Sequence, residues 1–199
     1  YIWIDAAANF PDYANNKENI AKDMAKIKAA GFTDIIVDVR PTTGDVLFNT
    51  DVVDQVKRMD VWGNSGYSYY ERTETWDYLQ AFIDEARKQE LKVNASINTF
   101  VGGYLCPYNL GHDGVLFRDD SKKGWASVAN LADGLTNTMD LLDDGVDYGA
   151  KFFNPANDDV QNFVLQLLAD LAKYDLDGII LDRCRYDDYG LESDFSDIS

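Results

Sequence analysis

Four short apolar runs alternate along the chain with three helical patterns, and this alternation restricts the folds open to it. The apolar runs cover residues 1–5, 34–40, 91–98 and 178–184. The helical patterns cover 19–30, 75–88 and a third segment that begins at Asn157. Gly31 is placed to end the first helix, and Thr75 can cap the second. Continuous Ile, Val and Leu runs separated by amphipathic helices predict a parallel sheet covered by helices.

Two architectures fit this order, an open doubly wound sheet and a (β/α)₈ barrel. An open sheet that binds nucleotides predicts a glycine-rich phosphate turn after the first strand, and residues 6–11 hold no such motif. The TIM barrel is therefore favoured within the α/β class. Because such barrels need about 250 residues or more, we expect residues 1–199 to form the N-terminal half of a barrel, with four βα units present.

Two long segments, 41–74 and 99–156, follow the second and third predicted strands. Segments of this length without regular structure are usually functional or disordered, and their aromatic content argues against disorder. Sugars can pack their apolar faces on such rings, while a role as local core remains equally open. Within the second segment, residues 126–142 are compatible with a short helix. The aromatic residues are Trp62, Tyr67, Tyr69, Tyr70, Tyr104, Tyr108, Trp125 and Tyr148, of which Trp62 and Trp125 are candidate substrate-binding residues.

Side chains alternate between the two faces of a strand, so residue parity sorts each run. One face of every strand then ends in a charged or amide side chain. The shared sets are Trp3 and Asp5; Ile36, Asp38 and Arg40; Asn94, Ser96 and Asn98; and Ile180 and Asp182. Because barrels build active sites at the carboxyl ends of their strands, these sets predict one polar mouth. For each residue alone, helix capping or ion pairing is as good an interpretation.

Charge and composition exclude several classes of partner. The formal net charge is −17, so nucleic acid and anionic membranes are disfavoured, whereas a neutral polymer is not repelled. No apolar run approaches the roughly 18–20 residues of a membrane span. Cys106 and Cys184 are predicted as two free buried thiols rather than as a disulfide, and neither belongs to a zinc motif. No cofactor is expected.

The carboxylates suit glycoside hydrolysis, which usually needs two carboxyl groups. The single histidine, His112, leaves a Ser–His–Asp triad or a two-histidine metal site without its parts. Asp182 is the candidate catalytic carboxylate, and Arg185 could keep it ionised. Calcium binding by Asp143, Asp144 and Asp147 is a weak alternative, because the spacing of an EF-hand is absent. The predicted substrate-binding residues are Asp5, Asp38, Arg40, Asn94, Asn98, Arg185, Tyr186, Asp187, Trp62 and Trp125.

Five segments resemble the glycosyl hydrolase-like 10 family across essentially the whole chain. They are IDA at 4–6, GFTDIIVDVRP at 31–41, LKVNASIN at 91–98, NPA at 154–156 and DGIILDRCRYD at 177–187. The resemblance implies a TIM-barrel catalytic domain that is periplasmic, secreted or on the bacterial cell surface. It also implies hydrolysis of a bacterial or dietary polysaccharide or of a peptidoglycan glycan strand, with Asp182 as nucleophile by likeness to retaining α-glycosidases.

The chain departs from this family in two ways. The family often has histidine where this chain has Asn94, so a proton-transfer role there is lost. The second carboxyl group is expected on a later strand, in the missing C-terminal half of the barrel. We therefore expect the 199-residue chain to be inactive alone. The alternative function is a carbohydrate-binding TIM barrel without catalysis.

Overall fold

The computed structural model describes residues 1–63, 66–106, 112–141 and 149–186. Its centre is a parallel sheet with the strand order β1-β2-β5-β11, so neighbours in the sheet follow their order along the chain. The four predicted apolar runs supply these strands. Their bounds are β1 Ile2–Ile4, β2 Asp34–Arg40, β5 Lys92–Asn98 and β11 Gly178–Asp182.

Three helices follow the predicted amphipathic patterns. They are α2 (Lys17–Ala29), α3 (Tyr78–Lys88) and α5 (Asp158–Leu171). Gly31 has a φ of 90°, as the predicted helix end requires, and Asn157 caps α5 through the backbone N–H groups of Asp159 and Val160. The N-cap of α3 is Asp77 rather than Thr75, because the Asp77 carboxylate accepts the N–H of Gln80 at 3.0 Å.

The main core lies between these helices and one face of the sheet. Ile35, Val37, Val93, Ala95 and Ile97 are buried and join one apolar cluster with the helices. The helical side of that cluster includes Ile20, Met24, Leu79, Phe82, Phe163 and Leu167. The opposite face carries the residues of the other parity, from Ile36 and Asp38 to Ser96 and Ile180. Apart from Arg40, the polar set predicted from parity therefore lies on the face turned away from the helices.

A helix that the sequence interpretation missed follows β1. Helix α1 (Ala6–Tyr13) begins directly after Asp5, whose carboxylate accepts the N–H of Ala8 at 2.7 Å. Pro11 lies inside this short helix and obscures its pattern, because proline normally marks a helix boundary. Phe10 is completely buried, and packing of this face holds the helix against the sheet.

The two long segments form small antiparallel sheets. Strands β3 (Arg58–Gly63) and β4 (Gly66–Glu71) make a hairpin, and β10 (Gly149–Phe152), β6 (Val101–Leu105) and β7 (His112–Asp113) make a three-stranded sheet. Residues 126–142 are compatible with a short helix, and their described part holds the hairpin β8 (Val128–Leu131) and β9 (Gly134–Asn137), followed by the short 3₁₀ helix η2 (Thr138–Leu141). The remaining elements are α4 (Val115–Arg118) and η1 (Asp120–Trp125).

A bulge in β2 corrects one prediction. Asp38 pairs with Ser96, but the next paired residue is Arg40 with Ile97, so Val39 is an extra residue in the ladder. Arg40 therefore does not share the face of Asp38. Its guanidinium lies 5.9 Å from the centre of the Phe153 ring and 5.7 Å from that of Phe163, which belongs to α5.

Within the described ranges no helix has the length and apolar character needed to cross a membrane. Cys106 is buried and Cys184 is exposed, and no disulfide joins them, so the prediction of buried thiols holds for Cys106 alone.

Candidate functional site

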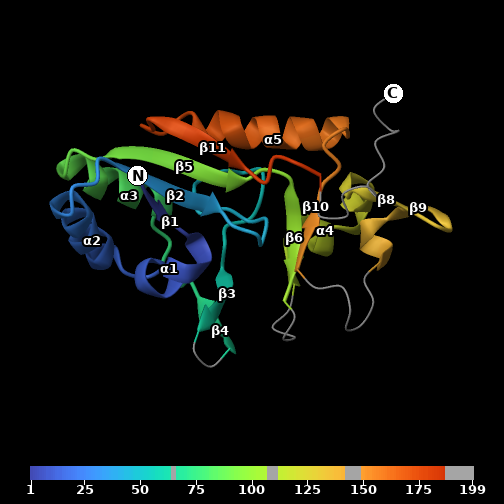
Figure 1. The fold of residues 1–199 in the computed structure, drawn as a ribbon, viewed down its shortest axis with the longest axis horizontal. Coiled ribbons are helices and arrows are strands. Elements are labelled where there is room, and N and C mark those ends of the chain that lie inside the picture. The colour runs from blue at the N-terminus through green and yellow to red at the C-terminus, as the bar shows by residue number, and fades with distance from the viewer. Residues whose placement is uncertain (64–65, 107–111, 142–148, 187–199) are drawn as a thin grey trace.

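The carboxyl ends of the strands meet at one side of the molecule. In Figure 1 the arrowheads of β2, β5 and β11 point toward the region that holds the β3–β4 hairpin and the β6–β10 pair. Asp182 pairs with Asn98 across β11 and β5, and the carboxylates of Asp5 and Asp182 are both close enough to Asp38 to influence its titration. The predicted convergence of these strand-end carboxylates is therefore present.

Asp38 is the buried member of this group. Burial is the main cause that raises its pKa from an ordinary 3.8 to about 7, and repulsion by the Asp5 carboxylate adds to the effect. Backbone N–H groups of Arg40, at 3.3 Å, and of Ala6 act in the opposite direction by stabilising the ionised form. Asp182 makes a weaker repulsive contribution. Near neutral pH, Asp38 is poised between its neutral and charged forms.

Asp5 and Asp182 are both exposed, but they differ in what holds them. Asp5 is the N-cap of α1, so part of its accepting capacity serves the helix. Asp182 accepts the N–H of the next residue, Arg183, at 2.8 Å, and its backbone carbonyl accepts the N–H of Thr99 at 2.7 Å. Arg183 has a φ of 45°, an unusual conformation for a side-chain-bearing residue. This turn leaves the Asp182 carboxylate open to a ligand.

The two predicted asparagines support the strands. Asn98 is buried and donates from its side chain to the carbonyl of Arg40 at 2.8 Å. Asn94 is half-buried and donates to the carbonyl of Ile35 at 3.2 Å. Asn94 lies further back along β5 than Asn98, level with Gly178 at the start of β11. Both amides thus tie β5 to β2.

Arg40 is fully buried and serves the interior. Its guanidinium donates to the carbonyls of Asn98 and Val101, the latter at 2.6 Å. Burial lowers its pKa to about 10, against the raising influence of Asp45 and Asp38. With no exposed surface, it braces β2 against β5 and β6, and the prediction that it binds substrate finds no support in its position.

A cavity of about 560 Å³ opens at this mouth. Asp5 and Arg183 line it together with aromatic side chains of β3, β4 and β6. Trp62 is 64% exposed, and its ring meets that of Tyr67 edge-on, with 5.2 Å between the ring centres. The remaining lining residues are Ala7, Ala8, Thr42, Thr43, Met59, Asp60, Tyr104 and Ala150.

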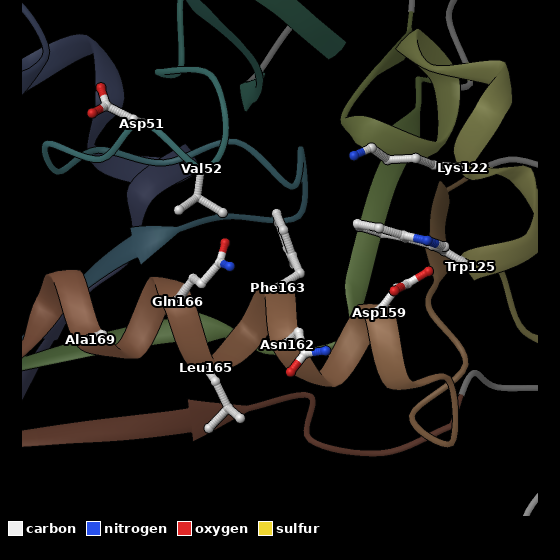
Figure 2. A pocket seen from close by; sticks show the side chains of 10 residues that line it. All are labelled: Asp51, Val52, Lys122, Trp125, Asp159, Asn162, Phe163, Leu165, Gln166 and Ala169. Carbon is white, nitrogen blue, oxygen red and sulfur yellow. The ribbon is translucent and has the colours of Figure 1, made fainter.

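Trp125, the other predicted tryptophan, lies elsewhere. Figure 2 shows it beside Lys122, in a hollow of about 700 Å³ that runs along α5 and contains Phe163. Its ring centre is 5.6 Å from that of Phe163, and the Lys122 ammonium lies 4.3 Å from its own. This hollow is larger than the mouth cavity, but no strand-end carboxylate lines it. The position of the carboxylates therefore favours the smaller mouth cavity as the candidate functional site.

The segment after β11 is described as far as residue 186. The Arg185 guanidinium lies 5.4 Å from the centre of the Phe152 ring and donates to the carbonyl of Tyr186 at 3.2 Å. Its predicted role in keeping Asp182 ionised stays a prediction. Asp187 lies outside the described residues, as do Tyr108, Tyr148, Asp143, Asp144 and Asp147.

No group of three or more His, Cys, Asp or Glu residues able to hold a metal is found in the described part of the chain. His112 lies in β7 and packs on Phe117, with 5.1 Å between the ring centres.

Sequence reasoning missed four polar residues of the mouth, Thr42, Thr43, Asp60 and Arg183. A signal for Asp60 was present, because RMDVW and YSYY flank a Gly-Asn-Ser-Gly turn, the pattern of a hairpin. Alternation along β3 then puts Asp60 on the face of Trp62. No comparable signal marks Thr43, whose place depends on the turn after β2.

Comparison with known proteins adds to this geometry. No family model matches the chain. An S-layer-related protein of Niallia circulans is 30% identical over 207 residues, which is 100% of this chain but 12% of that protein. The chain therefore corresponds to a small part of this relative.

Three solved structures share the mixed α/β fold. A hypothetical protein from Ruminiclostridium thermocellum has a TM-score of 0.58 at 11% identity, covering 98% of this chain and 81% of that one. Alpha-L-fucosidase isoenzyme 2 from Paenibacillus thiaminolyticus has a TM-score of 0.57 at 19% identity, and the match covers 91% of this chain and 23% of that one. A GH36 alpha-galactosidase from Geobacillus stearothermophilus, in complex with stachyose, has a TM-score of 0.50 at 10% identity, and the match covers 89% of this chain and 20% of that one. At such identities the likeness concerns the fold alone.

Proposed function

We propose that the chain is part of the TIM-barrel catalytic domain of a glycoside hydrolase. The observation that carries this proposal is the meeting of three carboxylates, Asp5, Asp38 and Asp182, at the carboxyl ends of parallel strands, beside a cavity lined by aromatic rings. Active sites of barrels lie at this end, and aromatic rings with a few polar groups are typical of sugar sites. The fold shared with a fucosidase and an alpha-galactosidase supports the same class.

Asp182 is the candidate nucleophile, because it is exposed and held by the turn at Arg183. Glycoside hydrolysis also needs an acid that protonates the leaving oxygen. Asp38 is buried and Asp5 caps a helix, so neither is well placed for that task. We infer that the acid comes from a later strand of the same barrel, as the resemblance to the glycosyl hydrolase-like 10 family implies.

The edges of the sheet support a continuing barrel. Leu181 in β11 and Trp3 in β1 are each 45% exposed, whereas the inner strand β2 is buried along its whole length. A strand pairing with β11, and a helix packed over Leu181, would cover this surface. Further βα units outside residues 1–199 would supply both.

A cell-surface location and a glycan substrate fit the relative from Niallia circulans, which is S-layer-related. The acidic chain, with its net charge of −17, favours a neutral polysaccharide over an anionic one.

The decisive test is Asp182→Asn in the protein that contains this chain together with its later strands. We expect glycan turnover to fall about 1,000-fold or more, because the nucleophile is lost, while glycan binding is retained. Asp175→Asn is the matched control, since Asp175 is an exposed carboxylate that pairs with Arg87 before β11 begins. Unchanged turnover in Asp182→Asn would contradict the assignment.

A carbohydrate-binding barrel without catalysis is the second candidate. The observation in its favour is that, among the carboxylates at the ends of the parallel strands, Asp182 alone is exposed and does not cap a helix. Glycan binding without turnover by the longer protein would select this function. Under either function the 199-residue chain alone is expected to be inactive, and turnover by it would refute the missing-acid argument.

A further inference from the structure

Two buried polar atoms of the mouth cavity have no hydrogen-bond partner among the described residues. They are Oγ1 of Thr43 and Oδ1 of Asp60. Thr43 is 4% exposed, and both residues line the cavity that Asp5 and Arg183 also line. A buried polar atom left without a partner costs free energy, so native proteins keep few of them. Both residues line the same cavity, so a ligand bound there can satisfy these atoms once the two side chains rotate toward it.

The chain holds both atoms in place by local structure. Thr43 sits in the turn after β2, where the N–H of Gly44 donates to the carbonyl of Pro41 at 3.0 Å. Gly44 has a φ of 82°, and a Cβ there would come within 3.2 Å of the backbone of Gly102, so the turn requires glycine. Asp60 lies on β3, where its carboxylate also interacts with the Cys106 thiol.

An aromatic platform stands beside these atoms. Trp62 lies two residues after Asp60 and therefore on the same face of β3, and it pairs with Tyr67 across the hairpin. The edge-on Tyr67 ring leaves Trp62 largely exposed, and Tyr67 in turn hydrogen-bonds to the Tyr104 hydroxyl. A flat apolar ring next to buried acceptors is the arrangement that binds the apolar face of a sugar and its hydroxyl groups together.

The charges of the cavity select among sugars. Asp5 and Asp60 contribute two carboxyl groups and Arg183 one guanidinium. A uronic acid or a sulfated sugar would place a further negative charge beside these carboxylates, which is unfavourable at this range. A neutral sugar places hydroxyl donors against Asp60 without that cost.

We propose that this cavity is a binding subsite for one neutral glycosyl unit, which stacks on Trp62 and hydrogen-bonds to Thr43 Oγ1 and Asp60 Oδ1. This proposal rests on the proposed function, because the subsite would hold a sugar of the glycan that Asp182 attacks. It adds residues whose effect on binding is separable from the chemical step.

The test measures binding by calorimetry in the longer protein carrying Asp182→Asn, so that no probe is consumed. The probes are isomaltoheptaose, cellohexaose, chitohexaose and hexagalacturonate. We expect at least one of the three neutral probes to bind and hexagalacturonate not to bind. Binding of hexagalacturonate, with or without a neutral probe, or binding of none of the four, would overturn the proposal.

Thr43→Val separates a binding role from a structural one. Valine has nearly the same shape and removes only the hydroxyl, so stability should be unchanged or increased, because an unpaired buried atom disappears. Affinity for the neutral probe should fall about fivefold, the loss of one hydrogen bond. Equal affinity in Thr43→Val and the parent would count against the subsite.

Trp62→Ala should weaken the same probe about tenfold or more, while Trp125→Ala, in the hollow along α5, leaves affinity unchanged. Asp60→Asn keeps the shape but removes the charge, and we expect a loss of similar size because hydrogen bonds to a charged acceptor are stronger. If Asp182→Asn abolishes turnover but these variants bind normally, the subsite is refuted and the hydrolase stands. If their binding is weakened but the parent shows no turnover, the subsite stands and catalysis is refuted.

Discussion

Asp38 and Arg40 stand two residues apart on one strand and meet opposite environments. The carboxyl of Asp38 faces the other acidic residues of the mouth, whereas Arg40 is enclosed by backbone carbonyls and two phenyl rings. An ion pair between them was a natural interpretation of the sequence. What the structure shows instead is a single hydrogen bond from the Arg40 backbone N–H to Asp38.

Asp38→Asn should change how stability depends on pH. In the folded protein the pKa of Asp38 is about 7 against an ordinary 3.8, so the folded state favours the neutral form. Its contribution is fully present below about pH 4 and is lost as pH rises through 7, by up to about 4 kcal/mol for a shift of roughly three units. Asparagine cannot ionise, and its side-chain oxygen can still accept the N–H of Arg40.

Urea unfolding between pH 5 and pH 8 measures this effect. The variant should gain stability relative to the parent as pH rises, and Asp175→Asn, on the surface, should show no such trend. A constant difference between variant and parent would mean that Asp38 titrates normally.

Arg40→Met should destabilise the protein by about 3 kcal/mol. Methionine fills the space of the stem, but it leaves the carbonyls of Asn98 and Val101 without their donor. Chemical denaturation gives the value, with Lys26→Met on exposed α2 as a control of little expected effect. A loss below about 0.5 kcal/mol, less than the net value of one ordinary hydrogen bond, would show that the guanidinium is dispensable.

Among the elements, those with strong periodicity could be predicted from the sequence. The stripes Ile20, Met24 and Ile27 in α2 and Leu79, Phe82 and Ile83 in α3 are buried as expected. Helix α1 could not be predicted, since it is short and contains Pro11, and contacts with the sheet rather than its own pattern stabilise it. Within 126–142 a short helix was expected without a position; the structure has η2 there, and the hairpin β8–β9 before it was not foreseen.

Asn157 caps the N-terminus of α5 and should contribute to the stability of the protein. Asn157→Ala should cost about 1 kcal/mol, because the N–H groups of Asp159 and Val160 lose their acceptor. Thermal or urea unfolding measures the loss. Asn162→Ala, at an exposed position inside the same helix, should be neutral or slightly stabilising, since alanine is the better helix former. Equal effects at the two positions would exclude a specific capping role.

For the whole molecule, the excess of acidic residues is the main electrostatic influence on stability. The chain has 35 acidic and 18 basic residues, and self-repulsion among them opposes the compact state. Raising sodium chloride from 0.01 M to 0.5 M should therefore increase Tm by a few degrees through screening. Choline chloride should act equally if screening is the cause. A Tm that falls with salt would show that ion pairs such as Arg118 with Asp45 matter more.

The sequence predicted the parallel sheet and the meeting of Asp5, Asp38 and Asp182. It could not reveal the cavity beside them, because Thr43 and Asp60 come from separate turns and strands whose approach depends on tertiary packing. Parity also failed for Arg40, since counting alternate residues assumes an unbroken ladder.

The extra residue in β2 has one more consequence. If β2 had no bulge, Val39 would pair with Ile97 and Arg40 with Asn98, and the guanidinium of Arg40 would face the open side, next to three acids. The bulge in β2 thus decides whether the cavity mouth is acidic or neutralised, and with it the charge of the molecules that can bind there.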